Sequence, residues 1–132
     1  MKKTNIPSVP VSWGEFTDKL TILEIKKEKI SDTVALANIN TEMSYLLDII
    51  SSYGHLSTIL ELKENLKSIN LKLWEIEDDI RDKTFNKEFD QAFIDLAISV
   101  AVFNKKRHAT KRLIDKALNS ELSEEKQYQP YE

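Results

Sequence analysis

The chain has 132 residues and a formal charge of −3; 41% of its residues are hydrophobic and 31% are charged. These values are typical of one globular domain, and the mild negative charge argues against nucleic-acid binding. The sequence contains no Cys, two His and two Gly. This excludes disulfides, thiolate metal sites, cysteine nucleophiles, a histidine-rich metal site and glycine-rich phosphate loops.

No stretch of the sequence has the character of a membrane segment. The start, Met1-Lys2-Lys3, is basic, but Pro7 and Pro10 interrupt the region where a signal peptide needs its apolar run. No window approaches the ~18 consecutive apolar residues of a membrane span. We therefore expect a cytoplasmic protein that does not associate with a membrane.

The first predicted helix follows an extended arm over residues 1–11. Ser12-Trp13-Gly14-Glu15 has the form of a capping box, in which Ser12 and Glu15 each accept from the other's backbone amide. This motif predicts a helix that starts at about Trp13. Because a helix with two apolar faces is buried on both, we expect it to pack against the domain and against a partner, most simply a second copy. One apolar face carries Phe16, Leu20, Leu23 and Ile30, and the second carries Ile22 and Ile25.

Ser31-Asp32-Thr33 ends this helix and supplies the N-cap of a second helix. Gly54, which follows Tyr53, is suited to end the second helix because glycine adopts the left-handed conformation at low cost. The apolar residues between these signals recur at helical spacing and comprise Leu36, Ile39, Met43, Leu46, Leu47 and Ile50.

Two long apolar stripes predict a helical hairpin in the second half of the chain. Thr84-Phe85-Asn86 separates the stripes, and Asn86 is the expected N-cap of the fourth helix. A turn near residues 84–85 places Ile80 opposite Phe89 and Leu66 opposite Phe103, with apolar residues on both sides of every pair between them. The first stripe comprises Ile59, Leu62, Leu66, Ile69, Leu73, Ile76 and Ile80; the second comprises Phe89, Phe93, Leu96, Val100 and Phe103, with Ile114 and Ala117 in the same register.

The predicted fold class is therefore all-α. We expect one domain over residues 1–132, built as an antiparallel bundle of four helices with a long hairpin between the third and the fourth. The tail over residues 120–132 is polar up to Tyr128, and Tyr128 and Tyr131 are placed to fold back onto the body.

Several strings in the chain resemble those of an uncharacterised family of short bacterial and phage proteins, known only as a domain of unknown function. They lie between Val9 and Tyr131 and include VSWGE at 11–15, DKLTILEIK at 18–26, LWEIEDDIR at 73–81, FIDLA at 93–97 and EEK at 124–126, followed by Tyr128, Pro130 and Tyr131. The resemblance implies an association with glycosyltransferase and surface-polysaccharide genes, but no reaction and no catalytic residue. Residues 101–104 and Lys105 depart from the family pattern, which is more polar there and ends in an acid.

A polar layer across the bundle is the first candidate site. The predicted helix alignment brings four carboxylates close to a cationic cluster on the fourth helix. As a functional site, the layer would be an anion or metal pocket with His108 as an acid–base group. As a structural element, it would be an ion-pair layer that fixes the register of the helices. Its members are Glu15, Asp18, Glu61, Glu64, Arg107, His108 and Lys111.

A second candidate is the acidic face at the end of the third helix, formed by Glu75, Asp78, Asp79 and Asp82. Carboxylates on one helical turn can hold Mg²⁺. The alternative is a solvated face with Arg81 and Lys83 as partners, because acids near a helix C-terminus oppose the helix dipole and need cations nearby.

The Glu-x-x-Glu and Glu-x-x-Asp motifs of helical pyrophosphatases also occur here, at Glu61 with Glu64 and at Glu75 with Asp78. They lie about 21 Å apart along one helix, at ~1.5 Å per residue, so one metal cluster cannot use both. The basic run Lys105–His108 could bind phosphate. Trp13 and Trp74 could mark a binding surface or fill a helix seam.

The sequence does not define a function. We favour a non-enzymatic binding or adaptor protein that needs no cofactor, associates with itself or with a protein partner, and belongs to a polysaccharide-related system. The alternative is a Mg²⁺-dependent phosphoester or nucleotide pyrophosphate hydrolase that uses the carboxylate layer.

Overall fold

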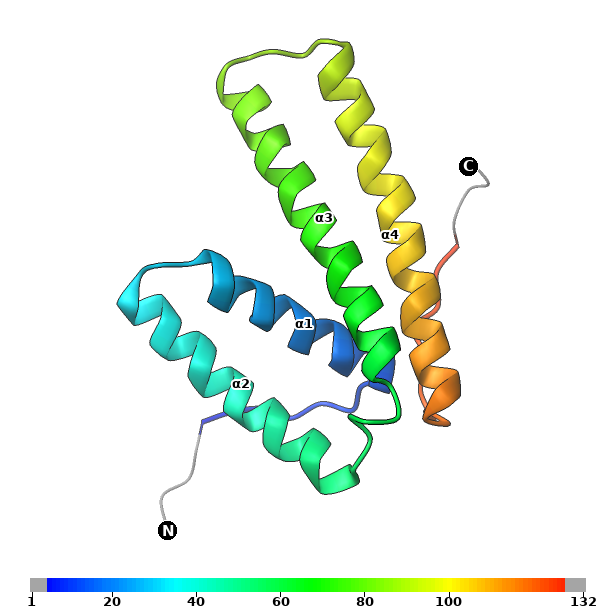
Figure 1. Ribbon diagram of the computed structural model, residues 1–132. Coiled ribbons are helices and arrows are strands. Elements are labelled where there is room, and N and C mark those ends of the chain that lie inside the picture. The colour runs from blue at the N-terminus through cyan, green and yellow to red at the C-terminus, as the bar shows by residue number, and fades with distance from the viewer. Residues whose placement is uncertain (1–4, 128–132) are drawn as a thin grey trace.

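The computed structural model describes residues 5–127 and contains four α-helices (Figure 1). They are α1 (Trp13–Lys29), α2 (Thr33–Tyr53), α3 (Leu60–Phe85) and α4 (Gln91–Ala117). No strand occurs within residues 5–127. The predicted all-α class is confirmed, and so is the hairpin, since α3 and α4 pack against each other more extensively than any other pair.

The starts of α1 and α2 and the end of α2 follow the predicted caps, although the Glu15 carboxylate, predicted to complete the capping box, accepts from Lys111 (2.7 Å) instead of the Ser12 amide. The Ser12 hydroxyl accepts from the amide of Glu15 (3.1 Å), and the Asp32 carboxylate accepts from the amide of Ala35 (2.9 Å). Gly54 ends α2 with φ of 68°, in the left-handed region. Short polar side chains and one glycine therefore set both helices at the predicted positions.

The predicted start of α4 is wrong. Asn86 ends α3 instead of starting α4, and Lys87 follows it in the left-handed region with φ of 55°. Asp90 is the N-cap of α4, and its carboxylate accepts from the amide of Phe93 (3.0 Å). Because the turn is longer than expected, Phe89 lies in the loop and is 61% exposed instead of facing the third helix.

The longer turn also shifts the register of the hairpin at its base. Continued one turn beyond Leu66 and Phe103, the predicted pairing places residue 107 opposite Leu62. In the structure, Arg107 and Asn70 of α3 instead both donate to the same oxygen of Asp18. Arg107 therefore lies beside Asn70 of α3 and not beside Leu62, a shift of about two helical turns along α3 from the predicted pairing.

Helix α1 lies between α2 and the α3–α4 hairpin and contacts all three (Figure 1). Ile25, on its second apolar face, is 1% exposed. Ile22, on the same face, is half-buried. The same chain therefore covers much of both faces of α1, and a partner on this helix stays a prediction. The buried apolar cluster around α1 comprises Phe16, Leu20, Leu23, Ile39, Met43, Leu46, Ile50, Ile59, Leu66 and Ile114.

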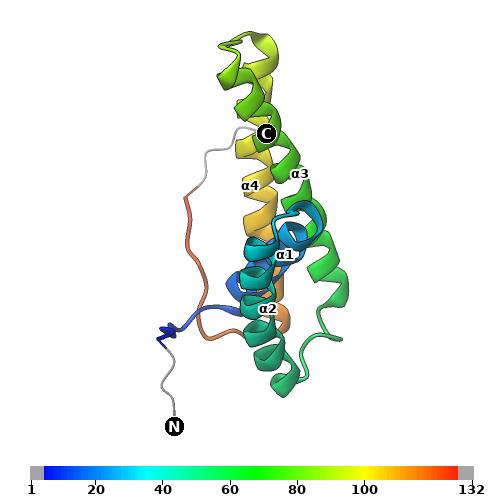
Figure 2. The same cartoon turned by 90° about the vertical axis from the view of Figure 1, so that its left-hand side faces the viewer.

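The far half of the α3–α4 hairpin extends beyond α1 and α2 (Figure 2). On α4, no residue from 91 to 109 is buried, whereas Thr110, Lys111, Ile114 and Asp115 are. The near half of the hairpin thus forms the core with α1, and the far half is a two-helix projection. Within residues 5–127, no helix has both the length and the apolar character required to cross a membrane.

Candidate functional site

The first turn of α1 is held directly against the end of α4. The amide of Trp13 donates to the Ser120 hydroxyl (3.1 Å), and the amide of Gly14 donates to the buried Asp115 carboxylate (2.6 Å). A Cβ on Gly14 would lie 2.3 Å from the backbone oxygen of Lys111. Glycine permits this close approach, and the carboxylate satisfies an N-terminal amide and complements the helix dipole.

Asp18, one turn further along α1, forms a two-pronged ion pair with Arg107 of α4. The Arg107 Nε donates to Oδ1 of Asp18 (2.9 Å), and Nη2 donates to Oδ2 (2.5 Å). The Asn70 amide from α3 also donates to Oδ1 (2.9 Å) and to the Thr21 hydroxyl (2.9 Å). Asp18 is 2% exposed. The hydrogen bonds that Arg107 donates to Asp18 raise the pKa of Arg107, and they satisfy a carboxylate that would otherwise be costly to bury.

Lys111 lies beside this pair and has two carboxylate partners. Its Nζ donates to Glu15 of α1 (2.7 Å) and to Glu124 of the C-terminal tail (3.2 Å). Burial acts to lower the pKa of Lys111, but the hydrogen bond that Lys111 donates to Glu15 and the charges of Asp18 and Glu15 outweigh it, and the pKa is raised. Lys111 is therefore a buried, fully charged ammonium group.

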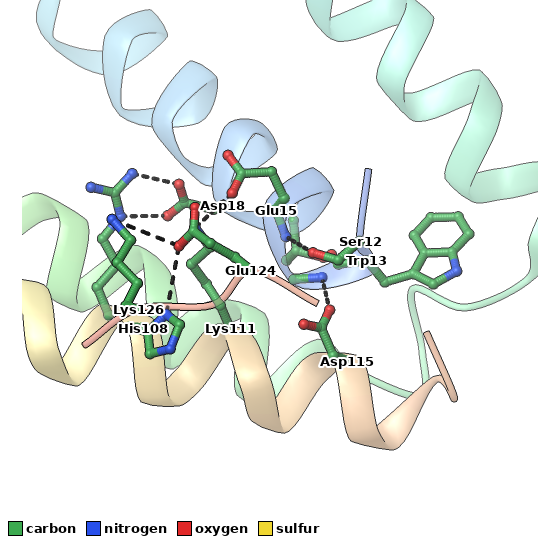
Figure 3. Close-up of polar contacts among 12 residues, drawn as sticks. Ser12, Trp13, Glu15, Asp18, His108, Lys111, Asp115, Glu124 and Lys126 are labelled. Atoms are coloured by element: carbon green, nitrogen blue, oxygen red, sulfur yellow. Dashed lines mark hydrogen bonds and ion pairs between the residues drawn. The ribbon is translucent and has the colours of Figure 1, made fainter. Parts of the chain in front are cut away.

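Glu124 reaches the cluster from a segment outside the helices. Figure 3 shows its carboxylate among Lys111, His108 and Lys126. Glu124 Oε1 lies 3.5 Å from His108 Nδ1 and 3.9 Å from Lys126 Nζ. Burial acts to raise the pKa of Glu124, but the hydrogen bond and charge of Lys111 and the charge of Lys126 outweigh it, and the pKa is lowered. The tail thus places an ionised carboxylate against the cationic side of the cluster.

These side chains surround a small polar pocket of about 110 Å³. Its walls come from α1, α4 and the tail, and its lining residues are Glu15, Asn104, Arg107, His108, Lys111, Glu124 and Lys126. A pocket of this size fits one carboxylate or phosphate group and little more.

The structure brings together five of the seven residues predicted for the polar layer: Glu15, Asp18, Arg107, His108 and Lys111. Glu61 and Glu64 lie elsewhere. Both are exposed, and Glu64 contacts Lys63 on its own helix (3.4 Å). The prediction aligned the first and third helices so that Glu61 and Glu64 lay beside Glu15 and Asp18. In the structure, the α3 residue that contacts Asp18 is Asn70. Whether the layer has a functional role stays a prediction.

The second acidic face, of Glu75, Asp78, Asp79 and Asp82, is exposed along its whole length. Asp78 pairs with Arg81, as expected. The second expected partner, Lys83, instead contacts Asp90 (3.0 Å) and Glu88 (3.8 Å) across the turn. In the part of the chain that the structure describes, no group of three His, Asp or Glu side chains is placed to hold a metal ion.

The sequence analysis did not identify Thr21, Asn70, Asp115 and Glu124 as members of the cluster, nor Asn104 and Lys126 as lining residues of the pocket. Asn70 carried a usable signal, because it is a polar residue beside Ile69 and close to the apolar stripe of α3. Glu124 carried none, since it lies in a polar tail without periodicity. The fold-back expected of Tyr128 and Tyr131 lies outside the described residues, but the preceding part of the tail does contact α4 through Glu124 and Glu125.

Trp13 packs within an aromatic group at the other side of the α1 N-terminus. Its ring centroid lies 5.2 Å from Phe16, 4.9 Å from Tyr53 and 5.0 Å from His55. Trp13 and Trp74 are both half-buried. Trp13 therefore fills a seam between α1 and the end of α2, with edge-to-face ring contacts.

Comparison with known proteins gives one family. The model of a family of unknown function, DUF6165, matches residues 8–131. The chain belongs to this family. No curated protein and no solved structure matches the chain. The function of this DUF6165 protein is therefore unknown, and its cluster of charged side chains is the starting point for a proposal.

Proposed function

We propose that this DUF6165 protein is a non-enzymatic binding protein whose pocket beside Lys111 takes a phosphate or carboxylate group. The position of Glu124 carries the proposal. A carboxylate from outside the bundle contacts Lys111 at 3.2 Å and lies 3.5 Å from His108. At the wall of the pocket, Lys111 therefore already binds one anionic group from outside the bundle, and an anionic ligand in the pocket can replace it.

The balance of charges supports an anion rather than a cation. Asp18 pairs with Arg107 and Glu15 pairs with Lys111, so these two carboxylates are matched inside the bundle. Glu124 is the additional carboxylate, supplied by the tail. When it leaves, Lys111 retains one carboxylate partner, Glu15, and has a donor available for another anion. A phosphate would meet the vacated donors with short, charge-assisted hydrogen bonds.

The hydrolase alternative has less support. It requires Glu15, Asp18, Glu61 and Glu64 around one Mg²⁺, but Glu61 and Glu64 are exposed away from the cluster. Both oxygens of Asp18 accept hydrogen bonds from Arg107, and one accepts a further bond from Asn70. A metal ion at Asp18 would have to displace that guanidinium, so a binding role fits the arrangement better.

The experiment is a thermal-shift screen of the purified protein with inorganic phosphate, pyrophosphate, a nucleotide sugar and Mg²⁺, each added separately. Nucleotide sugars are included because the family resemblance implies an association with polysaccharide genes. A ligand at ~100 times its dissociation constant adds about 2.7 kcal/mol and raises Tm by several degrees. We expect phosphate-bearing compounds to raise Tm and Mg²⁺ alone to have no effect.

Glu124→Gln and Glu125→Gln form the matched pair of variants. Glu125 is the neighbouring tail residue and contacts exposed Arg112 instead of the pocket (3.3 Å). The Glu124 carboxylate competes with a bound anion for Lys111, and Glu124→Gln removes its charge. We therefore expect Glu124→Gln to bind pyrophosphate more tightly than the wild-type protein does. Glu125→Gln should bind pyrophosphate as the wild-type protein does. Equal shifts in both variants would contradict the proposal. A Mg²⁺-dependent shift that Asp18→Ala abolishes would favour the hydrolase.

A further inference from the structure

We infer that the outer face of the far α3–α4 hairpin is a self-association surface, on which a second copy of this chain packs in antiparallel orientation. The inference is independent of the anion pocket. It starts from α4 between Phe93 and Phe103, where nine of eleven residues are apolar and only Asp95 and Ser99 are polar. A helix that is apolar nearly all round is normally covered nearly all round.

Helix α3 covers only one side of this segment. Ile94 and Ile98, four residues apart on one face of α4, are 47% and 55% exposed. Neither α1 nor α2 reaches the far half of the hairpin (Figure 2). Phe85 and Phe89 at the turn are also 87% and 61% exposed. The hairpin therefore presents large apolar side chains where the chain has no further helix to cover them.

The exposed apolar area is close to what a dimer needs. Phe85, Phe89, Ile94 and Ile98 together expose on the order of 500 Å², if each large side chain carries ~200 Å². A standard interface covers ~800 Å² per partner, of which somewhat more than half is apolar. These four side chains can thus supply most of the apolar part of such an interface.

The distribution of charge favours a second copy in antiparallel orientation. Residues 75–95, at the far end of the hairpin, contain eight acids and three bases. Residues 104–116, at the near end of α4, contain six Lys and Arg residues and one acid. Arg107 and Lys111 are paired inside the bundle, whereas Lys106, Arg112 and Lys116 are exposed. Parallel packing would bring the two acidic ends together. Antiparallel packing brings the acidic end of each copy beside the basic end of the other, including exposed Lys106.

Sedimentation equilibrium over a range of concentrations tests the surface. We expect a dimer of twice the 15.3 kDa monomer mass. Ile98→Glu should raise the dissociation constant by a factor on the order of 100, because each interface would bury two new charges. Ile94→Glu should act similarly, and circular dichroism should show unchanged helix content because both side chains are exposed in the monomer. The matched control is Val34→Glu on α2, also at an exposed position, which should remain dimeric.

A charge variant tests the orientation. Lys106→Glu should weaken the dimer several-fold because it places an acid beside the acidic end of the second copy, whereas Lys27→Glu on the exposed side of α1 should not. A wild-type protein that is monomeric at the highest attainable concentration would overturn the inference. A dimer that persists in Ile98→Glu would also overturn it, because the contact would lie elsewhere. Unchanged or tighter association of Lys106→Glu would overturn the antiparallel orientation.

Discussion

The ion pair between Asp18 and Arg107 should be a main determinant of the stability of the bundle. Asp18→Ala removes the acceptor of three hydrogen bonds, two from Arg107 and one from Asn70. Breaking a buried pair by removing one partner costs ~3–5 kcal/mol, because the other partner keeps its desolvation penalty. The Arg107 side chain is 29% exposed and regains some hydration. We therefore expect Asp18→Ala to lower the free energy of unfolding by about 3 kcal/mol.

A double-mutant cycle with Arg107→Met isolates the pair. Each single variant leaves a polar group without its partner, whereas the double variant removes both, so the double variant should be less destabilised than the sum of the single variants by about 2 kcal/mol. Urea unfolding at one fixed protein concentration provides the four free energies. The control is Glu42→Ala, which breaks the exposed Lys19–Glu42 pair of similar length (2.7 Å) and should cost less than about 1 kcal/mol.

Two results would refute this reasoning. If Asp18→Ala costs no more than Glu42→Ala, Arg107 and Asn70 are not left unsatisfied when Asp18 is removed. If the free energies of the single variants simply add, the side chains are not energetically coupled. If Asp18→Ala is as stable as the wild-type protein or more stable, Asp18 does not stabilise the bundle. That result would indicate a carboxylate that serves ligand or metal binding at a cost in stability.

Three further outcomes are expected. Gly14→Ala should destabilise the protein by about 2 kcal/mol or more in urea unfolding, because its Cβ would meet the Lys111 backbone oxygen at 2.3 Å; Asn38→Ala, at an exposed position within α2, is the control and should have little effect. Lys87→Gly should stabilise the protein by roughly 0.5–1 kcal/mol, since φ of 55° strains a side chain there; a loss of stability would show that the Lys87 side chain stabilises the turn. The pKa of Glu124 in the folded state lies below its ordinary value. The ionised Glu124 side chain therefore contributes its full stabilisation at pH values above the unfolded-state pKa of about 4.3, and this stabilisation is lost as the pH falls through the folded-state pKa. The stability difference between the wild-type protein and Glu124→Gln should therefore be constant near neutral pH and shrink in acid; a constant difference throughout would contradict the lowered pKa.

The sequence was sufficient to predict the helices wherever a local signal marked their ends. Ser12, Asp32 and Gly54 act through their own backbone neighbours, so their effect could be read without knowledge of the tertiary structure. The start of α4 was predicted wrongly because two polar residues, Asn86 and Asp90, are both suitable N-caps, and Asp90 is the one that caps the helix. This difference of four residues changes the register of the whole hairpin.

The part of the candidate site that was predicted correctly also depends on local patterns within single helices. Asp18 and Arg107 could be placed in the core because each is in register with an apolar stripe. Glu61 and Glu64 were assigned by assuming aligned helices, and the distance between sequence-remote helices depends on crossing geometry that no local pattern encodes. Glu124 reaches Lys111 through an irregular tail, whose path follows from tertiary contacts alone.

The most direct test of the anion pocket is a titration of the isotopically labelled protein with pyrophosphate, followed by amide chemical shifts in two-dimensional NMR. We expect the largest shifts at His108 and Lys111, together with changes at residues 121–127 as Glu124 leaves the pocket. The same titration of Glu124→Gln should saturate at lower pyrophosphate concentration. Shifts confined to other basic surfaces, such as the last turn of α1 with Lys26, Lys27 and Lys29, or no saturable shifts at all, would contradict an anion site at the α1–α4–tail cluster.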